Sequence, residues 1–514
     1  MNISLKHANR HKNGFTIVEL LIVIVVIGIL AAITVIAFNG VRSQAVNATL
    51  QSDLRNLATE LMNTKTTSGA LPTALASLNG GAGPKKSEST QFDYSVTGDA
   101  FCVSAQSTTD TKAKKYHFDS TENSVKEGGC PGPWSYVAAG WSQTCGVSKS
   151  LLYCWGRNDT SQLGDGTTAN SATPRAVYTG GVLGGKTITS VAAGQSVTCA
   201  IASGRAYCWG ADYTSAIGRP FWLPSDGFTR PKPVYINVND PANPYGIPDA
   251  PVTSITAGQK HACAIVGGEA WCWGSNEGSN GVLGNDGTND EYAGVKVATD
   301  TGLAGKTLVK VSGSDYHTCA FAQTSEIYCW GPNGSGESGD GTTNTTSKPR
   351  SVVMNGALSG KTVTDIAAGT SFTCAVASGK AYCWGYDGYA SLGNGSAGSS
   401  LVPMAVDDTG VLAGKTVTSI TAGASHACAV TSDGGVYCWG TPGANGTNDY
   451  SQSPHKVDLD SSLEGKKIQS VAAGRSHTCA RTDDNWVYCW GLSNYGQLGQ
   501  GSGEETAIVK TVAP

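Results

Sequence analysis

The spacing of apolar residues changes once along the chain, from a helical period to that of short strands. From Leu20 to Phe38 there is no charged residue, and residues 39–64 then keep apolar side chains at helical spacing among polar ones. The pattern predicts one long helix from about Phe15 to Thr64. Its 19 uncharged residues reach roughly 28 Å, about the thickness of a bilayer's hydrocarbon core, so this segment can span a membrane.

Turn residues end the helical pattern, and a short strand-rich segment follows. Gly69, Pro72 and the glycine-rich stretch at 80–84 interrupt the helical spacing. A small antiparallel sheet is then predicted from three segments: Phe92–Val96, Ala100–Ala105 and Lys115–Asp119. The run Pro131-Gly132-Pro133 is typical of a stiff linker.

From Trp134 onward the chain repeats. A Cys-Trp-Gly triplet recurs at intervals of roughly 50 to 64 residues, with its tryptophan at Trp155, Trp209, Trp273, Trp330, Trp384, Trp439 and Trp490. Each unit is predicted to contain four short strands, which is the make-up of a β-propeller blade, so residues 134–514 are expected to form one domain. The last strand, Ala507 to Val512, is expected to complete a blade with Ser135 to Ala138 and so close the ring.

The repeated cysteines come in pairs on one predicted hairpin of each unit. In the second unit a two-residue turn at Ser203-Gly204 sets Cys199 opposite Cys208 in a closely spaced, non-hydrogen-bonded pair. Where the spacing is one residue longer, a three-residue turn such as Ser432-Asp433-Gly434 restores the register. Zinc is the alternative interpretation, but two cysteines at this spacing on a hairpin rarely form such a site, so no metal is expected. We expect seven disulfides: Cys145/Cys154, Cys199/Cys208, Cys263/Cys272, Cys319/Cys329, Cys374/Cys383, Cys428/Cys438 and Cys479/Cys489.

Composition and charge limit the compartment and the ligand classes. Sixteen cysteines indicate an oxidising environment outside the cytoplasm. Lys and Arg number 35 against 39 Asp and Glu, without the basic clusters of nucleic-acid binders, so no nucleic-acid partner is expected. The basic residues Lys6, Arg10 and Lys12 keep the N-terminus in the cytoplasm and send everything after Phe38 outward.

The segment Gly14-Phe15-Thr16-Ile17-Val18-Glu19-Leu20, between a basic leader and the apolar helix, closely resembles the class III leader of type IV prepilins. The resemblance implies that a prepilin peptidase cleaves after Gly14 and methylates the new amine of Phe15. It also implies that Glu19 pairs with the amine of a neighbouring pilin subunit during filament assembly. A lone carboxylate at the edge of an apolar run costs roughly 3 kcal/mol unless it is paired, which agrees with that role.

Two further resemblances complete the predicted fold. The small sheet is similar to the reduced head of small pilins, which implies a disulfide between Cys102 and Cys130. The repeated motifs Ala-Gly-x-x-His-x-Cys-Ala, Tyr-Cys-Trp-Gly and Gln-Leu-Gly-x-Gly resemble the RCC1 family of seven-bladed propellers. The expected fold is therefore mainly β: a seven-bladed RCC1-like propeller C-terminal to a long pilin α-helix with a small α+β pilin head. The expected boundaries are a cleaved leader at 1–14, a helix at 15–66, a head at 67–130, a linker at 131–133 and a propeller at 134–514.

No catalytic constellation is present, so neither an enzyme nor a cofactor is expected. Residues 180–187 satisfy the P-loop pattern literally, but here Gly-Lys-Thr opens a strand, whereas a P-loop aims backbone amides at phosphate from the start of a helix. Four histidines occupy one repeated slot and are expected to hydrogen-bond the scaffold: His261, His317, His426 and His477.

The repeat is interrupted by an insertion after Gly210. It holds aromatic and arginine residues of the kind that anchor partners and sugars, with these candidates for ligand binding: Tyr213, Arg219, Phe221, Trp222, Phe228 and Arg230. The alternative is that the insertion packs these side chains on the propeller's own surface.

Together these features predict an exported, minor, tip-located pilin-like subunit whose propeller binds a surface protein or glycan. Its other expected partners are further pilin subunits, the prepilin peptidase and the membrane. The RCC1 resemblance implies protein binding, but the nucleotide-exchange role of that family does not transfer to an extracellular propeller. The alternative function is a structural or priming pseudopilin with no specific ligand.

Overall fold

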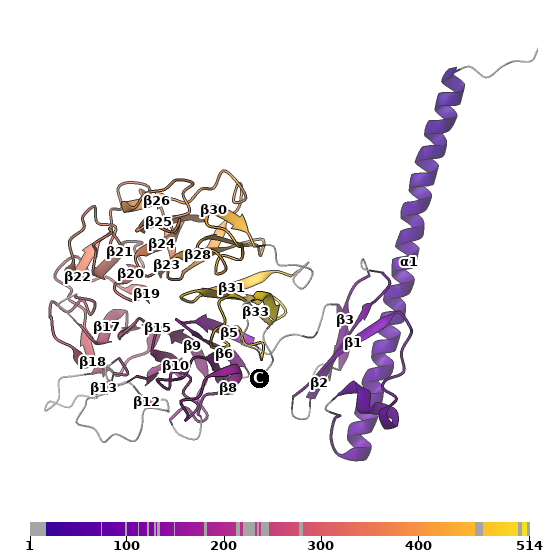
Figure 1. The fold of residues 1–514 in the computed structure, drawn as a ribbon, viewed down its shortest axis with the longest axis horizontal. Helices are drawn as coiled ribbons and strands as arrows, with labels where there is room; N and C mark the ends of the chain where they lie inside the picture. Colours follow the sequence, from indigo (N-terminus) through magenta and orange to yellow (C-terminus); the bar gives the residue numbers. More distant parts are fainter. Residues whose placement is uncertain are drawn as a thin grey trace, which may run out of the picture. The chain divides into compact units, whose positions relative to one another are not determined.

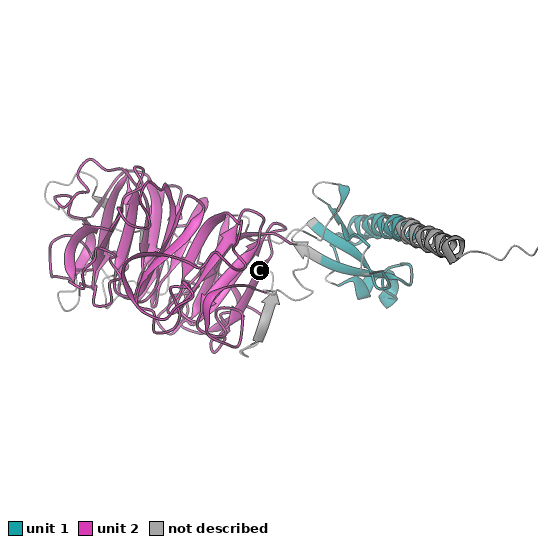
Figure 2. Ribbon diagram, turned by 90° about the horizontal axis from the view of Figure 1, so that it is seen from above, with its two compact units in different colours: residues 1–131 teal, residues 132–514 magenta. Residues whose placement is uncertain are grey.

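The structure is a computed structural model in which the chain forms two compact units, Met1–Pro131 and Gly132–Pro514 (Figure 2). It describes residues 17–72, 74–97, 100–110, 113–120, 123–127, 130, 134–148, 150–178, 182–211, 216–218, 232–233, 236–237, 246–276, 281–457, 466–501 and 506–510. Only the backbone is described for residues 17–41, 95–97, 100, 127, 232–233, 236–237 and 506–510.

The N-terminal unit is built on one helix, α1 (Ile17–Ser68), of 52 residues (Figure 1). Buried apolar side chains recur at helical spacing in its second half and face the sheet of this unit: Leu50, Leu54, Leu57 and Leu61. The buried carboxylate of Asp53 on the same helix accepts hydrogen bonds from Ser87 and from the Thr90 hydroxyl, the latter at 2.6 Å. The helix is thus fixed to the following segment by both apolar and polar contacts.

The sheet of this unit has four antiparallel strands in sequence order: β1 (Thr90–Thr97), β2 (Ala100–Ser107), β3 (Tyr116–Asp119) and β4 (Ser124–Glu127). A short 3₁₀ segment, Leu75–Gly81, precedes it. The sequence pattern does not predict the fourth strand because Val125 is its only apolar residue, so no alternation marks it. A disulfide joins Cys102 on β2 to Cys130, with 5.8 Å between the two Cα atoms.

The C-terminal unit contains seven four-stranded antiparallel blades among its described residues (Figure 1). The first strands of the blades are β5 (Trp134–Ala139), β9 (Ile188–Ala193), β15 (Val252–Ala257), β19 (Leu308–Gly313), β23 (Val363–Ala368), β27 (Val417–Ala422) and β31 (Ile468–Ala473). The second strands are β6 (Gln143–Ser148), β10 (Val197–Ala202), β16 (His261–Val266), β20 (Thr318–Ala322), β24 (Phe372–Ala377), β28 (His426–Thr431) and β32 (His477–Thr482).

The third strands are β7 (Leu151–Gly156), β11 (Arg205–Gly210), β17 (Glu269–Gly274), β21 (Ile327–Gly331), β25 (Lys380–Gly385), β29 (Val436–Gly440) and β33 (Val487–Gly491). The fourth strands are β8 (Ser171–Ala176), β12 (Lys232–Pro233), β18 (Glu291–Lys296), β22 (Thr346–Ser351), β26 (Ser400–Ala405), β30 (Ser451–Lys456) and β34 (Thr506–Lys510). A separate parallel pair joins β13 (Ile236–Asn237) to β14 (Ile247–Pro248).

The repeated tryptophan is what holds each blade to the one before it. Its side chain is almost completely buried in every blade. Its indole Nε1 donates a hydrogen bond of 2.9 to 3.0 Å to a loop carbonyl of the preceding blade, with partners Trp155 to Gln497, Trp209 to Gln162, Trp273 to Ala216, Trp330 to Val282, Trp384 to Glu337, Trp439 to Ser391 and Trp490 to Ala444. One residue therefore supplies both apolar burial and a directional contact at each boundary.

The ring does not close as the sequence analysis expected. The last strand β34 pairs with β33 of its own blade, and β5 pairs with β6, so no blade is shared between the two ends. The first and last blades instead meet through the contact found at the other boundaries, from Trp155 to Gln497. Because each sequence unit already holds four strands, no strand has to be exchanged.

The seven hairpin disulfides are present, and the predicted register is confirmed. Each joins the second strand of a blade to the third, with Cα atoms 4.1 Å apart in every pair: Cys145–Cys154, Cys199–Cys208, Cys263–Cys272, Cys319–Cys329, Cys374–Cys383, Cys428–Cys438 and Cys479–Cys489. In each hairpin the two cysteines are direct partners in the strand register.

The turn of each hairpin keeps this register. Ser203 and Gly204 both have positive φ, 49° and 76°, as the tight two-residue hairpin turn requires. In the sixth blade the turn is one residue longer, and Cys428 still lies opposite Cys438.

The membrane prediction falls on the first half of α1. Among the described residues no helix is long and apolar enough to cross a membrane. The side chains of the apolar run from Leu20 to Phe38, and that of Glu19, are outside the description, as are Gly14, Phe15 and the linker at 131–133.

Candidate functional site

Two connections of every blade emerge at the same end of the propeller, because the strands of a blade are antiparallel and follow one another in sequence. These are the turn between the first and second strands and the loop between the third and fourth. We call this end the loop face. Its turns are residues 140–142, 194–196, 258–260, 314–317, 369–371, 423–425 and 474–476, and its described loop residues include 157–170, 275–276, 281–290, 332–345, 386–399, 441–450 and 492–501.

At the centre of the loop face a network of side chains crosses the mouth of the channel. The indole of Trp141, in the first blade, donates a 2.6 Å hydrogen bond to Oδ1 of Asp315, in the fourth. Thr370 donates to the other carboxylate oxygen at 3.0 Å. The guanidinium carbon of Arg475 lies 3.8 Å from the centroid of the Trp141 ring. Four blades therefore contribute to one bridged mouth.

Burial governs the ionisation of this network. Desolvation raises the pKa of Asp315, while the hydrogen bonds from Trp141 and Thr370 and the charge of Arg475 oppose that rise. A carboxylate with several donors and a nearby cation is a satisfied acceptor, and its described partners, Trp141, Thr370 and Arg475, include no general base. The network is suited to holding the mouth together.

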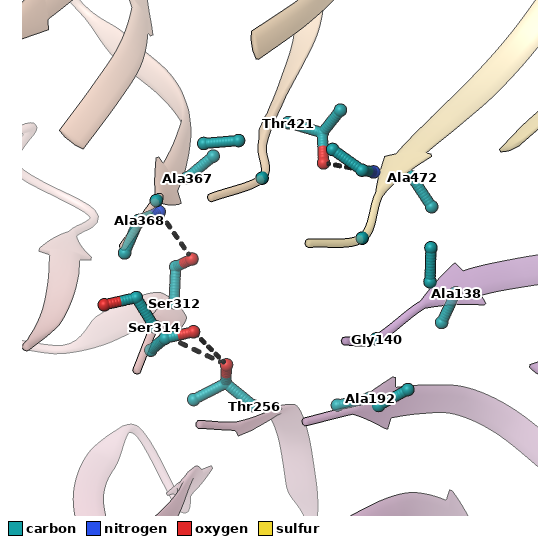
Figure 3. A pocket seen from close by; sticks show the side chains of 18 of the residues that line it. Ala138, Gly140, Ala192, Thr256, Ser312, Ser314, Ala367, Ala368, Thr421 and Ala472 are labelled. Atoms are coloured by element: carbon teal, nitrogen blue, oxygen red, sulfur yellow. Dashed lines mark hydrogen bonds between the residues drawn. The ribbon is translucent and has the colours of Figure 1, made fainter. Parts of the chain in front are cut away.

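The network borders a cavity of about 340 Å³, which is lined by these turn residues and by the first strands of the blades (Figure 3). Hydroxyl groups on these strands accept hydrogen bonds from the backbone of the next blade, as from Gly313 to Thr256, from Ala368 to Ser312 and from Ala473 to Thr421. Small side chains such as those of Ala138 and Ala192 fill much of the remaining wall. Among the described residues no group of three or more His, Cys, Asp or Glu could hold a metal ion.

The paired cysteines are scaffold residues and take no part in a binding site. The seven on the third strands have no exposed surface, and all are disulfide-bonded: Cys154, Cys208, Cys272, Cys329, Cys383, Cys438 and Cys489. Their partners on the second strands are equally buried: Cys145, Cys199, Cys263, Cys319, Cys374, Cys428 and Cys479. None of these cysteines lines the central cavity, and none keeps a free thiol. Their role is therefore to staple the hairpins, and they offer no group to a ligand or to a metal ion.

The four repeated histidines are scaffold residues, as predicted. Each is buried, and its Nε2 lies 2.8 to 2.9 Å from a threonine hydroxyl of the next blade, in the pairs His261 with Thr318, His317 with Thr373, His426 with Thr478 and His477 with Thr144. The threonine hydroxyl itself donates to a loop carbonyl, so the histidine donates from Nε2. Burial lowers the pKa to about 4 for His261 and His477 and to about 3 for His317 and His426, so all four are neutral at pH 7.

The Gly-Lys-Thr sequences also have a structural role. Lys186 precedes the strand β9, and its Nζ lies 5.9 Å from the centroid of the Tyr207 ring in the same blade. The same lysine-over-tyrosine contact recurs in three other blades, in the pairs Lys361 with Tyr382, Lys415 with Tyr437 and Lys466 with Tyr488. The rejection of a P-loop is therefore consistent with the structure, because this lysine covers an aromatic ring beside a strand.

The exposed tyrosines were not identified from the sequence. Among the described residues six tyrosines are both large and exposed, and all six lie on or directly beside the loop face: Tyr292, Tyr316, Tyr386, Tyr389, Tyr450 and Tyr495. Of the exposed aliphatic residues, Leu151, Val182 and Val411 lie at the opposite end of the blades, whereas Leu401, the second residue of β26, lies beside the loop face. The sequence could have shown this grouping. Once the four strands of each blade are assigned, every connection between strands can be placed at one end of the propeller or the other.

The predicted ligand-binding residues of the insertion all lie outside the described residues: Tyr213, Arg219, Phe221, Trp222, Phe228 and Arg230. The insertion begins after β11, at the loop-face end of the second blade. Its role remains a prediction.

Comparisons with known proteins agree with both halves of the chain. Residues 9–35 match the prokaryotic N-terminal methylation motif. Two models of the regulator of chromosome condensation (RCC1) repeat match residues 150–201, 325–376 and 378–430, and residues 308–337, 417–452 and 468–497.

Two relatives each match about 70% of the chain. The ultraviolet-B receptor UVR8 of Arabidopsis thaliana is 29% identical over 385 residues, covering 73% of this chain and 81% of UVR8. The human E3 ubiquitin-protein ligase HERC2 is 28% identical over 378 residues, covering 70% of this chain but only 7% of HERC2. Among solved structures, Prp20p of Saccharomyces cerevisiae superposes with a TM-score of 0.58 at 20% identity, covering 74% of this chain and 87% of that one.

The solved structure shares the propeller fold, and the sequence matches place the methylation motif and the repeats in separate parts of the chain. The chain therefore joins a type IV prepilin-like N-terminus to an RCC1-family seven-bladed β-propeller.

Proposed function

We propose that this exported pilin-like protein is a minor, tip-located filament subunit that attaches the cell to a surface protein or glycan through the loop face of its propeller. The observation that carries the proposal is the gathering of the six exposed tyrosines on that face. Tyrosine supplies a large, rigid contact area with a polar tip, and aromatic residues are enriched where proteins bind partners. A scaffold protein without a ligand has no need to gather such residues at one end.

The N-terminal motif supports a route to the surface. In this proposal a prepilin peptidase cleaves after Gly14, the new amine of Phe15 is methylated, and Glu19 pairs with the amine of a neighbouring subunit. The apolar run holds the subunit in the cytoplasmic membrane before assembly, with the propeller outside. The eight disulfides fit an oxidising compartment, since such bonds rarely persist in the cytoplasm.

The size of the propeller supports a tip position. The unit from Gly132 to Pro514 is much larger than the N-terminal unit that carries α1. If many copies were packed along the shaft of a filament, each would need space for its propeller beside those of its neighbours. A subunit at the tip needs space for only one propeller.

Immunogold microscopy of cells that produce the protein tests the proposal. Antibody against the propeller should label filament tips, and Glu19→Gln should abolish this label because the assembly carboxylate is lost. The matched control is Glu88→Gln, which makes the same charge change at an exposed position outside α1 and should keep tip labelling. Label along the whole shaft would refute the tip position.

The structural or priming role is distinguished by attachment. If cells lacking the propeller attach as well as the wild type, the propeller is not an adhesion module and the priming role stands in its place.

A further inference from the structure

Three of the exposed tyrosines form one aromatic cluster across a blade boundary. Tyr386 and Tyr389 lie in the loop of the fifth blade, and Tyr450 lies at the end of the loop of the sixth. We call these three residues the tyrosine cluster. The ring centroids of Tyr386 and Tyr389 are 6.1 Å apart with the rings edge to face, and those of Tyr389 and Tyr450 are 6.5 Å apart with only 19° between the planes.

The cluster is open to solvent. Tyr386, Tyr389 and Tyr450 are 41%, 45% and 61% exposed, and Tyr450 is the most exposed large hydrophobic residue in the part of the chain described with side chains. Three adjacent exposed rings are unlike the single exposed apolar residues that every surface carries. The contact area is therefore available without any rearrangement.

The loop of the fifth blade is held in place by its own hydrogen bonds. The carboxylate of Asp387, which is only 5% exposed, accepts hydrogen bonds from the backbone of Leu392 at 2.9 Å and of Gly398 at 3.0 Å. The hydroxyl of Ser391 donates to the carbonyl of Tyr386 at 2.7 Å. Both ends of the segment that carries Tyr386 and Tyr389 are thus fixed.

The loop of the sixth blade is built in the same way around Asn445. Its Nδ2 donates to the carbonyls of Gly440 at 3.0 Å and Asp449 at 2.9 Å, and its Oδ1 accepts from the backbone of Thr447 at 2.8 Å. Asn445 is completely buried, so this side chain is part of the scaffold. Because the backbone on both sides of the cluster is fixed before binding, less conformational entropy is lost when a ligand settles on the rings.

Charge around the cluster excludes one class of ligand. Residues 386–399 and 441–450 contain no Lys or Arg, and their charged residues are Asp387 and Asp449. An anionic ligand such as a uronic-acid polymer or a nucleic acid would meet carboxylates and no lysine or arginine in these loops. A neutral ligand meets no such penalty.

The side-chain chemistry separates a sugar from a protein partner. Protein interfaces usually combine tyrosine with arginine and with apolar anchors that fill pockets. These two loops have no arginine, and their one leucine, Leu392, is fully buried and cannot serve as an anchor. They offer instead flat rings, phenol hydroxyls and small polar groups, which match the apolar C–H face and the hydroxyl edge of a pyranose.

We propose that the tyrosine cluster is a binding site for a neutral polysaccharide, with pyranose rings stacked on Tyr389 and Tyr450 and Tyr386 bordering them. This inference rests on the proposed attachment function and names its site and ligand class. The other exposed tyrosines of the loop face lie outside the site.

The test uses cells that display the full chain, probed with fluorescent dextran, mannan, β-1,3-glucan and, as the anionic polymer, alginate. At least one neutral polymer should bind wild-type cells, and replacing all three tyrosines by Ala should weaken that binding at least tenfold. The matched control Leu151→Ala removes a large side chain that is 46% exposed at the opposite end of the blades and should bind like the wild type. Replacing the cluster by Phe keeps the rings and should retain most of the binding.

Display of each variant is measured with an antibody that recognises only the folded propeller, because binding is compared only between variants that are folded and displayed in equal amounts. Wild-type binding of alginate alone, failure of all three neutral polymers, or unchanged binding by the Ala variant would each overturn the inference.

The experiments distinguish a wrong binding site from a wrong attachment function. If the Ala variant attaches like the wild type while cells lacking the propeller do not attach, the site is wrong and the attachment function stands. If cells lacking the propeller attach normally, the attachment function itself is wrong.

Discussion

The indole Nε1 of Trp155, in the first blade, donates a 2.9 Å hydrogen bond to the carbonyl oxygen of Gln497, in the last. The hydroxyl of Thr144 donates to the same carbonyl at 2.8 Å, and His477 of the last blade contacts that hydroxyl at 2.9 Å. The same arrangement joins the fourth and fifth blades through Trp384, Thr373 and His317. The ring is thus closed by the contact that also joins consecutive blades.

Replacing Trp155 by Phe should test the contribution of this contact to closure. The ring of Phe fills most of the space but cannot donate, so the free energy of unfolding should fall by about 1–2 kcal/mol. Trp330→Phe is the matched control at an internal boundary and should cost a similar amount, because its indole makes an equivalent bond to Val282. Denaturant unfolding measures both. No loss in either variant would show that the indole hydrogen bond does not hold the blades.

The hairpin disulfides should each stabilise the propeller modestly. Since Cys199 and Cys208 are only 9 residues apart, the loop-closure model gives about 2–3 kcal/mol for replacing both by Ala. Alkylation under denaturing, non-reducing conditions should modify no cysteine of the exported protein, because every cysteine is paired. Detection of two or more modified cysteines per chain would contradict the pairing.

The buried histidines should make the propeller sensitive to acid. Their pKa values in the folded state are lowered to about 3 or 4, while an unfolded histidine titrates near its ordinary value, so the unfolded state binds more protons below about pH 6.5. The contribution of these neutral histidines to the free energy of unfolding is therefore complete above about pH 6.5 and is lost as the pH falls from about 6.5 towards 4.

His477→Gln should reduce this loss, because glutamine does not titrate and the first blade already uses Gln143 in the same slot. Unfolding free energies measured from pH 4 to 7.5 check it. If the free energy of unfolding falls as steeply between pH 6.5 and 4 in His477→Gln as in the wild type, the buried neutral His477 does not cause the acid sensitivity.

Asp315 should have the opposite dependence. Burial raises its pKa, so over the range between the ordinary and the raised pKa the folded state binds more protons than the unfolded state. Its contribution to stability therefore falls as the pH rises through the raised pKa. Asp315→Asn should remove this fall in stability. Thr370→Val deletes a hydrogen bond to the carboxylate, so it should raise the pKa of Asp315 further and extend the fall to higher pH. Equal pH dependence of the wild type and both variants would refute the role of burial.

The repeat made most of the propeller predictable. The Cys-Trp-Gly triplets set the blade frame, and the two-residue turn at Ser203-Gly204 fixes the register that brings Cys199 opposite Cys208. The sequence of β34, from Thr506 to Lys510, does not by itself distinguish pairing with β33 from pairing with β5. Only the number of strands in each unit, which is four, argues against a blade shared between the two ends of the ring. Closure depends on contacts between residues more than 300 positions apart, such as Trp155 and Gln497.

The candidate site was less accessible from sequence. Tyr386, Tyr389 and Tyr450 lie in loops of different blades, and no local pattern marks them as neighbours. The network from Trp141 to Asp315 crosses the channel and is invisible for the same reason. A ligand site was predicted in the insertion after Gly210 because this insertion breaks the repeat. The tyrosine cluster lies in loops of ordinary length, so the repeat pattern does not mark it.

Attachment of cells that produce the chain without residues 134–514 tests the account's central claim most directly. Filaments should still assemble, since α1 and the N-terminal motif are intact, but adhesion to surfaces that bind wild-type cells should drop at least tenfold. Wild-type adhesion by these cells, with filaments present in normal number, would contradict the claim that the propeller is the attachment module.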